Sequence, residues 1–100
     1  MFDYFEMIGT YEERKIKRDI VNGYVIDTVR VTDAYPPYET AVAHKDFNNG
    51  AWIILERSAT IPEAEATHDK WVKTLQADVN ELTDMVTGKT YRKKTRRRDV

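Results

Sequence analysis

Two histidines are the residues in this chain best suited to acid–base chemistry or metal binding. His68 lies near Glu65 and Asp69 on the apolar side of a helical pattern, so its imidazole could act as a base or a metal ligand. His44 falls on a different predicted element, and two histidines with scattered carboxylates match no metal-ligand spacing. We therefore interpret both histidines as structural residues and expect no metal site and no cofactor.

Nucleophilic catalysis is equally poorly supported by the residue types. The chain has no cysteine, and its one serine, Ser58, lacks the flanking glycines that expose a nucleophile on a sharp turn. The four glycines, at positions 9, 23, 50 and 88, are too dispersed to form a phosphate-binding loop. We expect the chain not to be an enzyme and to have no small-molecule substrate.

The last twelve residues concentrate the positive charge. Residues 89–100 contain seven of the sixteen Lys and Arg residues and one acidic residue, a net charge of +6. Residues 1–88 contain nine basic and sixteen acidic residues, a net charge of −7. The residues expected to contact a nucleic acid or a protein partner are Lys89, Tyr91, Arg92, Lys93, Lys94, Arg96, Arg97 and Arg98.

Three interpretations of this basic segment remain open. Its cations can neutralise the phosphates of DNA or RNA, with Tyr91 stacking on a base. They can instead bind an acidic protein, including the body of a neighbouring copy, or serve only as a solvated tail. Membrane binding is not expected, because no apolar anchor accompanies the cations.

A second group of candidates consists of aromatic residues outside the predicted core. Tyr35 and Tyr38 bracket Pro36 and Pro37 in a predicted loop, where exposed aromatic rings are typical of protein contacts. Phe2 and Phe5 lie in an N-terminal arm that can dock on its own sheet or on another subunit.

Length and composition predict one small domain. One hundred residues, 41% of them hydrophobic and 33% charged, can bury a modest core beneath a well-solvated surface. The longest apolar run, residues 51–55, is far shorter than the roughly 18 residues of a membrane span, and the N-terminus is too short and acidic for a secretory signal. We expect a soluble intracellular protein.

The first pair of strands is predicted from the turn Asn22-Gly23. A two-residue loop aligns Val21 with Tyr24, Ile20 with Val25, Arg18 with Asp27 and Ile16 with Val29. The residues expected on the apolar face are Ile16, Ile20, Val25 and Val29. The same face is expected to carry a cross-strand ion pair between Arg18 and Asp27. Those expected to face solvent are Lys15, Lys17, Asp19, Thr28 and Arg30.

A second pair of strands is predicted at residues 39–44 and 51–57, around a loop at residues 46–50. Residues 52–55 are apolar at every position, which predicts a strand that is central in the sheet or covered on both faces.

A long helix is predicted to follow. Thr60 can cap its N-terminus, with Glu63 three residues on and Pro62 in the first turn. The apolar spacing continues to about Val86, and Gly88 supplies a stop. We therefore predict an α+β fold of two layers, a four-stranded antiparallel sheet of two hairpins with one long C-terminal helix, in a domain of residues 1–88. Residues 89–100 are expected to form a basic tail appended to that domain.

Three segments also carry a family resemblance: residues 38–44 (YETAVAH), 49–56 (NGAWIILE) and 63–72 (EAEATHDKWV). Together they resemble small uncharacterised proteins of tailed bacteriophages, in which a YET-V strand precedes a Trp-containing strand and a helix with EEA, GH and WV. The likeness spans about residues 36–73, lacks the glycine near the histidine, and leaves the basic tail outside.

The resemblance implies a phage-type structural or interaction protein, virion-associated or acting in assembly. Its partners would be other phage structural subunits or a second copy, with DNA or RNA reached through the tail, in the virion or the host cytoplasm. A non-virion protein that binds nucleic acid or modulates the host is the alternative.

Overall fold

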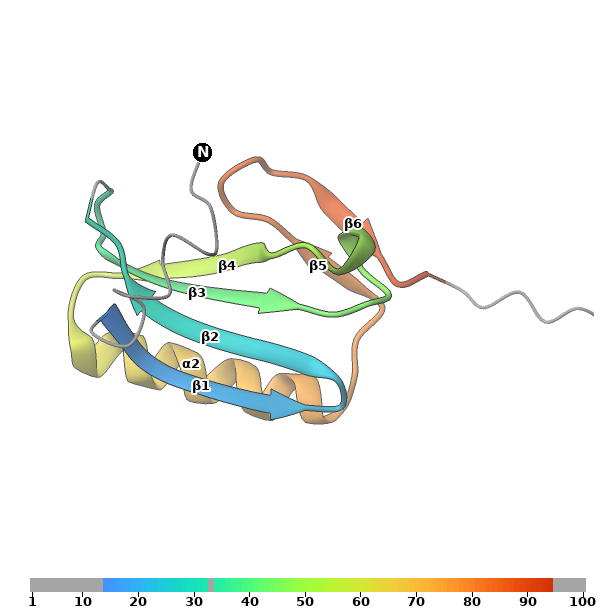
Figure 1. Cartoon of the computed structure of the whole chain (residues 1–100), viewed down its shortest axis with the longest axis horizontal. Helices are drawn as coiled ribbons and strands as arrows, with labels where there is room; N and C mark the ends of the chain where they lie inside the picture. Colours follow the sequence, from blue (N-terminus) through green and yellow to red (C-terminus); the bar gives the residue numbers. More distant parts are fainter. Residues whose placement is uncertain (1–13, 33, 95–100) are drawn as a thin grey trace, which may run out of the picture.

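The computed structural model describes residues 14–32 and 34–94. Strands β1 (Lys15–Val21), β2 (Tyr24–Arg30), β3 (Tyr38–Ala43) and β4 (Ile53–Ser58) form an antiparallel sheet in the order β1-β2-β3-β4. Helix α2 (Ile61–Gln76) packs across one face, and β5 (Glu81–Thr83) pairs with β6 (Thr90–Arg92) in a second, small sheet (Figure 1). The predicted two-layer α+β fold is confirmed.

The predicted turn joins β1 and β2, and most of the predicted register is correct. Asn22 and Gly23 both have positive φ, at 51° and 80°, as this tight turn requires. Val21 pairs with Tyr24, Ile20 with Val25 and Arg18 with Asp27, but a bulge follows, so Lys15 and not Ile16 lies opposite Val29.

The prediction of which side of this hairpin is buried was wrong. Tyr24, Ile26 and Thr28 are fully buried beneath α2, whereas Ile20 is 69% exposed. Both faces of the hairpin carry apolar residues, so alternation alone does not decide between them. Three of the five polar residues assigned to solvent instead bond to the helix: Thr28 and Asp19 to His68, and Lys17 to Asp69 at 2.6 Å.

The β3–β4 hairpin forms as predicted, with Ala41 opposite Ile54 and Val42 opposite Ile53. Its loop contains the short turn η1 (Asn48–Gly50), in which all three residues have positive φ. Residues 52–55 were predicted to be central in the sheet or covered on both faces; the central position is wrong, because β4 is an edge strand of the sheet. α2 packs against β4, and the outer edge of β4 is bonded by the start of the β5–β6 turn, where Met85 N–H donates to Ile54 O at 2.8 Å.

Helix α2 begins where its capping residues predict. Thr60 is extended and its hydroxyl accepts the Glu63 N–H at 3.3 Å, while the Glu63 carboxylate accepts the Ala59 N–H at 3.2 Å. Ala64, His68 and Leu75 form its buried stripe, with Trp71 and Val72 partly buried beside them.

The prediction that this helix continues to Val86 was wrong, because α2 ends at Gln76. Asp78 has a φ of 64°, which a right-handed helix cannot accommodate, and the chain reverses there. Val79 and Leu82 still pack against the core, but from the segment after the helix. Gly88, predicted as the helix stop, has a φ of 76° in the turn between β5 and β6.

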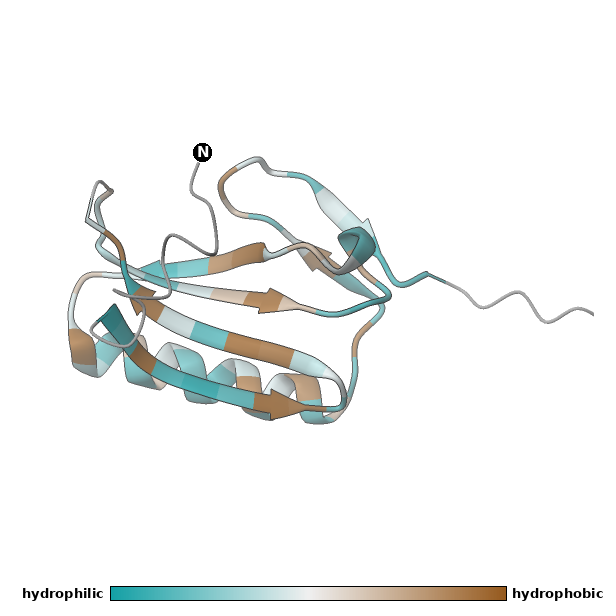
Figure 2. Cartoon of the chain, viewed as in Figure 1, coloured by the Kyte–Doolittle hydropathy of each residue, from teal (hydrophilic) through white to brown (hydrophobic). Residues whose placement is uncertain are grey.

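The hydrophobic core joins residues of the sheet to Leu75 of α2, and Figure 2 shows apolar stretches of β2 and β4 in brown. The fully or nearly buried members of this core are Tyr24, Ile26, Val42, Phe47, Ile53, Leu55, Leu75 and Leu82. No helix in the described part of the chain has the length and apolarity needed to cross a membrane.

Candidate functional site

The first half of the C-terminal basic segment, residues 89–100, is built into the fold. Thr90–Arg92 forms β6, with Arg92 opposite Glu81 and Tyr91 opposite Leu82. Tyr91 packs against the hydrophobic core, and the Lys89 ammonium lies 5.2 Å from the centre of its ring. The expectation of an appendage beginning at residue 89 is therefore wrong for residues 89–94.

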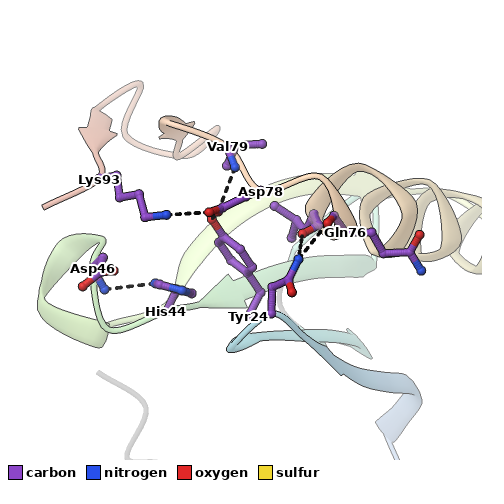
Figure 3. Close-up of polar contacts among 9 residues, drawn as sticks. Tyr24, His44, Asp46, Gln76, Asp78, Val79 and Lys93 are labelled. Carbon is purple, nitrogen blue, oxygen red and sulfur yellow. Dashed lines mark hydrogen bonds and ion pairs between the residues drawn. The ribbon is translucent and has the colours of Figure 1, made fainter. Parts of the chain in front are cut away.

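A cluster formed by Tyr24, Asp78 and Lys93 fixes the end of β6 to the body (Figure 3). The Tyr24 hydroxyl donates a hydrogen bond to one Asp78 oxygen, and the Lys93 ammonium donates to the other at 2.6 Å. The Lys93 backbone N–H also bonds to Asn80 O at 2.8 Å. One carboxylate thus joins β2, the end of α2 and the C-terminal segment.

The electrostatics of this cluster follow from that geometry. The Lys93 ammonium, and after it the Tyr24 hydroxyl, lowers the pKa of Asp78 from 3.8 to about 2. Burial, and after it the bond to Asp78, raises the pKa of Tyr24 from 10.0 to about 12. Asp78 is therefore ionised and Tyr24 neutral near neutral pH.

The loop between β3 and β4 packs against the same cluster. The Tyr24 ring lies 4.2 Å from the His44 ring and 6.0 Å from the buried Phe47 ring, between centroids. His44 Nδ1 accepts the Asp46 N–H at 3.0 Å, which makes Nδ1 the acceptor nitrogen and gives His44 a structural role. Asp46 O in turn accepts the Lys94 N–H at 2.7 Å.

The turn between β5 and β6 presents two apolar side chains to solvent. Met85 is 47% and Val86 is 57% exposed, and the turn carries a brown patch in Figure 2. The buried Asp84 shapes this turn by accepting the N–H groups of Val86 at 2.8 Å and Thr87 at 3.0 Å. Burial raises the pKa of Asp84, but the backbone donors outweigh burial and hold it below its usual value.

His68 lies in a chain of buried polar contacts between α2 and the sheet. Its Nε2 contacts Asp19 Oδ2 at 2.8 Å, its Nδ1 contacts Thr28 Oγ1 at 2.8 Å, and Thr28 Oγ1 contacts Thr40 Oγ1 at 2.8 Å. An Asp–His–hydroxyl order is that of an activated nucleophile. Thr28 is fully buried and its hydroxyl is shared with Thr40, however, so a substrate has no access to it.

The remaining predicted contact residues are dispersed. Tyr35 is 80% exposed in the loop before β3, whereas Tyr38 is half-buried in β3. The loop before β3 and the start of β3 lie at the opposite end of the sheet from β6, so these two tyrosines are not brought to the basic segment (Figure 1). Phe2, Phe5, Arg96, Arg97 and Arg98 lie outside the described residues.

Sequence reasoning missed Tyr24, Asp78 and Asp19 as organising residues. Asp78 occurs in Ala77-Asp78-Val79-Asn80, and two turn-forming residues so close together are a signal that the helical pattern is broken there. Tyr24 and Asp19 carry no such signal, because their roles depend on contacts with residues 49 or more positions away.

The described residues contain no group of three or more His, Cys, Asp or Glu side chains arranged to hold a metal ion. Comparison of the chain with protein-family models, with curated proteins and with solved structures finds no match.

Proposed function

We propose that this chain is a non-catalytic phage-type structural or assembly protein, associated with the virion, whose C-terminal basic segment binds the phosphate backbone of nucleic acid. The observation that carries the proposal is the anchoring of that segment. β6 and the Tyr24–Asp78–Lys93 cluster hold residues 89–94 against the core, so the point from which the remaining cations continue is fixed on the body.

The charges support a polyanion as the partner. Arg92 and Lys93 are each paired with a carboxylate of the body, Glu81 at 3.1 Å and Asp78 at 2.6 Å. Lys89 and Lys94 are exposed, and three further arginines follow at positions 96–98. Contacts between these cations and phosphates would release counterions, so binding should be independent of sequence and sensitive to salt.

A neighbouring copy of the chain is a second candidate partner, favoured by one specific observation. The body already supplies carboxylates to this segment, because Asp78 pairs with Lys93 and Glu81 with Arg92. The same complementarity between an acidic body and a basic segment can operate between two copies.

The phage setting rests on the resemblance of about residues 36–73 to small phage proteins. Mass spectrometry of purified particles tests it, since a virion component must be present at a reproducible copy number. Absence from particles, with nucleic-acid binding intact, would favour a non-virion or host-modulating protein in the host cytoplasm.

Fluorescence anisotropy with a labelled oligonucleotide, measured across a salt series, tests the binding function. We expect the Arg97→Gln/Arg98→Gln variant to lose affinity and its log–log salt slope to become shallower by about 1.5 to 2. A matched control removes the same charge from the body with Arg30→Gln/Lys73→Gln, two exposed residues far from the segment in the chain.

The outcomes separate the two candidates. Salt-sensitive binding lost in the first variant and kept in the control supports nucleic acid as the partner. No binding by the unmodified chain, together with salt-sensitive self-association in sedimentation experiments, supports the neighbouring copy and overturns nucleic-acid binding.

A further inference from the structure

We infer that the nucleic-acid contact surface does not end with the C-terminal basic segment but extends onto the body through Lys45, which with Lys94 forms a phosphate site built from two segments. This inference rests on the proposed function and adds to it a contact residue from the β3–β4 loop, 49 positions away from Lys94 in the chain.

The two lysines are brought together by a backbone hydrogen bond. The Lys94 N–H donates to Asp46 O at 2.7 Å, and Lys45 is the residue directly before Asp46. With standard bond lengths, this contact places the Cα atoms of Lys45 and Lys94 within about 10 Å of each other.

Both side chains are available to a partner. Lys45 and Lys94 are exposed, and within residues 14–32 and 34–94 neither ammonium makes an ion pair. The neighbouring cation Lys93 is neutralised by Asp78. Asp46, next to Lys45 in the β3–β4 loop, carries one negative charge, so the net charge of Lys45, Asp46 and Lys94 is still positive. Among the described residues, Lys45 and Lys94 therefore provide positive charge here that no carboxylate pairs with.

The spacing of the two lysines is fixed by the fold. On one side, Phe47 is fully buried, its N–H bonds to His44 O at 3.0 Å, and the His44 ring packs on Tyr24. On the other side, Lys93 is bonded to Asn80 and Asp78 immediately before Lys94. Figure 3 shows His44, Asp46, Tyr24, Asp78 and Lys93 gathered in this region.

A nucleic-acid strand has the charge spacing that suits this arrangement. Phosphates recur at about 3.4 Å along the axis per strand of B-form DNA, so two lysines with Cα atoms within about 10 Å of each other can reach phosphates of the same strand. Lys45 and Lys94 can thus neutralise phosphates of one strand. Contacts of this kind position the protein without reading bases.

The test is Lys45→Gln in the full chain, compared with Lys73→Gln as a matched control on the exposed side of α2. Binding is measured by anisotropy with an oligothymidine strand and with a mixed-sequence duplex across a salt series. We expect Lys45→Gln to weaken both complexes severalfold and to reduce the salt slope by about 1, and Lys73→Gln to change neither.

A second readout does not depend on any substitution. Acylation of lysines followed by mass spectrometry should show Lys45 and Lys94 protected when nucleic acid is bound, and Lys73 modified to the same extent with and without it.

Thermal unfolding of Lys45→Gln should match that of the unmodified chain, since the side chain is exposed.

Failure of this inference is distinguishable from failure of the proposed function. If Arg97→Gln/Arg98→Gln loses binding while Lys45→Gln behaves like Lys73→Gln, the segment binds nucleic acid without Lys45 and the inference is overturned. If Lys45 and Lys73 substitutions weaken binding equally, the effect is one of total charge, and the inference is again overturned. If the unmodified chain binds no nucleic acid, both fail and an acidic protein partner is favoured.

Discussion

Two polar networks hold this small fold together, and they differ in where they lie and what they join. The His68 network, defined as Asp19, His68, Thr28 and Thr40, joins α2 to the first three strands, and three of its four members are fully buried. The Tyr24–Asp78–Lys93 cluster lies at the rim of the core and joins the body to the C-terminal segment.

The difference separates a folding role from an anchoring role. A buried polar group that loses its partner carries the full desolvation cost, so the His68 network should control the stability of the domain. An ion pair at the rim is rehydrated when it is broken, so the cluster should control chiefly the position of the basic segment. Substitutions in the His68 network should therefore lower the stability of the domain more than substitutions in the cluster, which should chiefly change the position of the basic segment.

The largest effect is expected from His68→Ala. The substitution leaves a cavity and leaves Thr28 without one of its two partners, which should lower the free energy of unfolding by about 3 kcal/mol. Urea unfolding measures this loss, with Lys73→Ala on the exposed side of the same helix as the control. A loss no larger than that of the control would mean that the buried network does not stabilise the domain.

A smaller effect is expected from Tyr24→Phe, which keeps the buried ring and removes only the hydroxyl. Asp78 retains its bonds to Lys93 and to the Val79 N–H, so we expect a loss of about 1 to 2 kcal/mol. The control is Tyr35→Phe, at an exposed tyrosine, which should be neutral. If Tyr24→Phe costs more than His68→Ala, the ranking of the two networks is reversed.

These networks also mark where sequence reasoning succeeds and where it stops. The Asn-Gly turn, the Thr60 cap and the two-layer α+β fold are local or pattern signals, and the structure has all three. The buried face of β1–β2 was predicted wrongly because Thr28 and Asp19 are polar. Both side chains bond to His68, 40 or more positions away, and no local pattern reports such a partner.

The C-terminal half shows the same limit in another form. The spacing of Val79, Leu82 and Val86 fits a helix, yet Leu82 is buried between exposed Glu81 and Thr83, which is the alternation of a strand. Leu82 fits both patterns, as a member of a helical stripe and as the buried residue of a short strand, and the positive φ of Asp78 ends the helix before it. The basic residues could be found from sequence, whereas the pairing of Lys93 with Asp78 and the proximity of Lys45 to Lys94 could not.

The pH dependence of stability should isolate the rim cluster. Because Lys93 and Tyr24 lower the pKa of Asp78 to about 2, its stabilising contribution is complete above its unfolded value of 3.8 and is lost as the pH falls from about 4 towards 2. The gap in stability between the unmodified chain and Asp78→Asn should therefore narrow across this range in urea titrations at each pH. A gap that stays constant down to pH 2 would show that the ionised carboxylate contributes nothing.

The smallest effect on folding is expected from Arg92→Gln. Arg92 pairs with Glu81 at 3.1 Å, but the two side chains are 82% and 50% exposed, so the pair should contribute less than about 1 kcal/mol. Lys93→Gln should cost more than Arg92→Gln, because the Lys93 side chain is only 32% exposed and its partner Asp78 also bonds to the buried Tyr24. Urea unfolding and nucleic-acid affinity are measured for both variants to separate the two roles. Arg92→Gln should weaken nucleic-acid binding with almost no change in the free energy of unfolding, because it removes a cation from the segment and leaves the core untouched. If Arg92→Gln destabilises the domain as much as Lys93→Gln, the outer face of β6 belongs to the folding machinery, and the distinction between a folding network and an anchoring network does not hold.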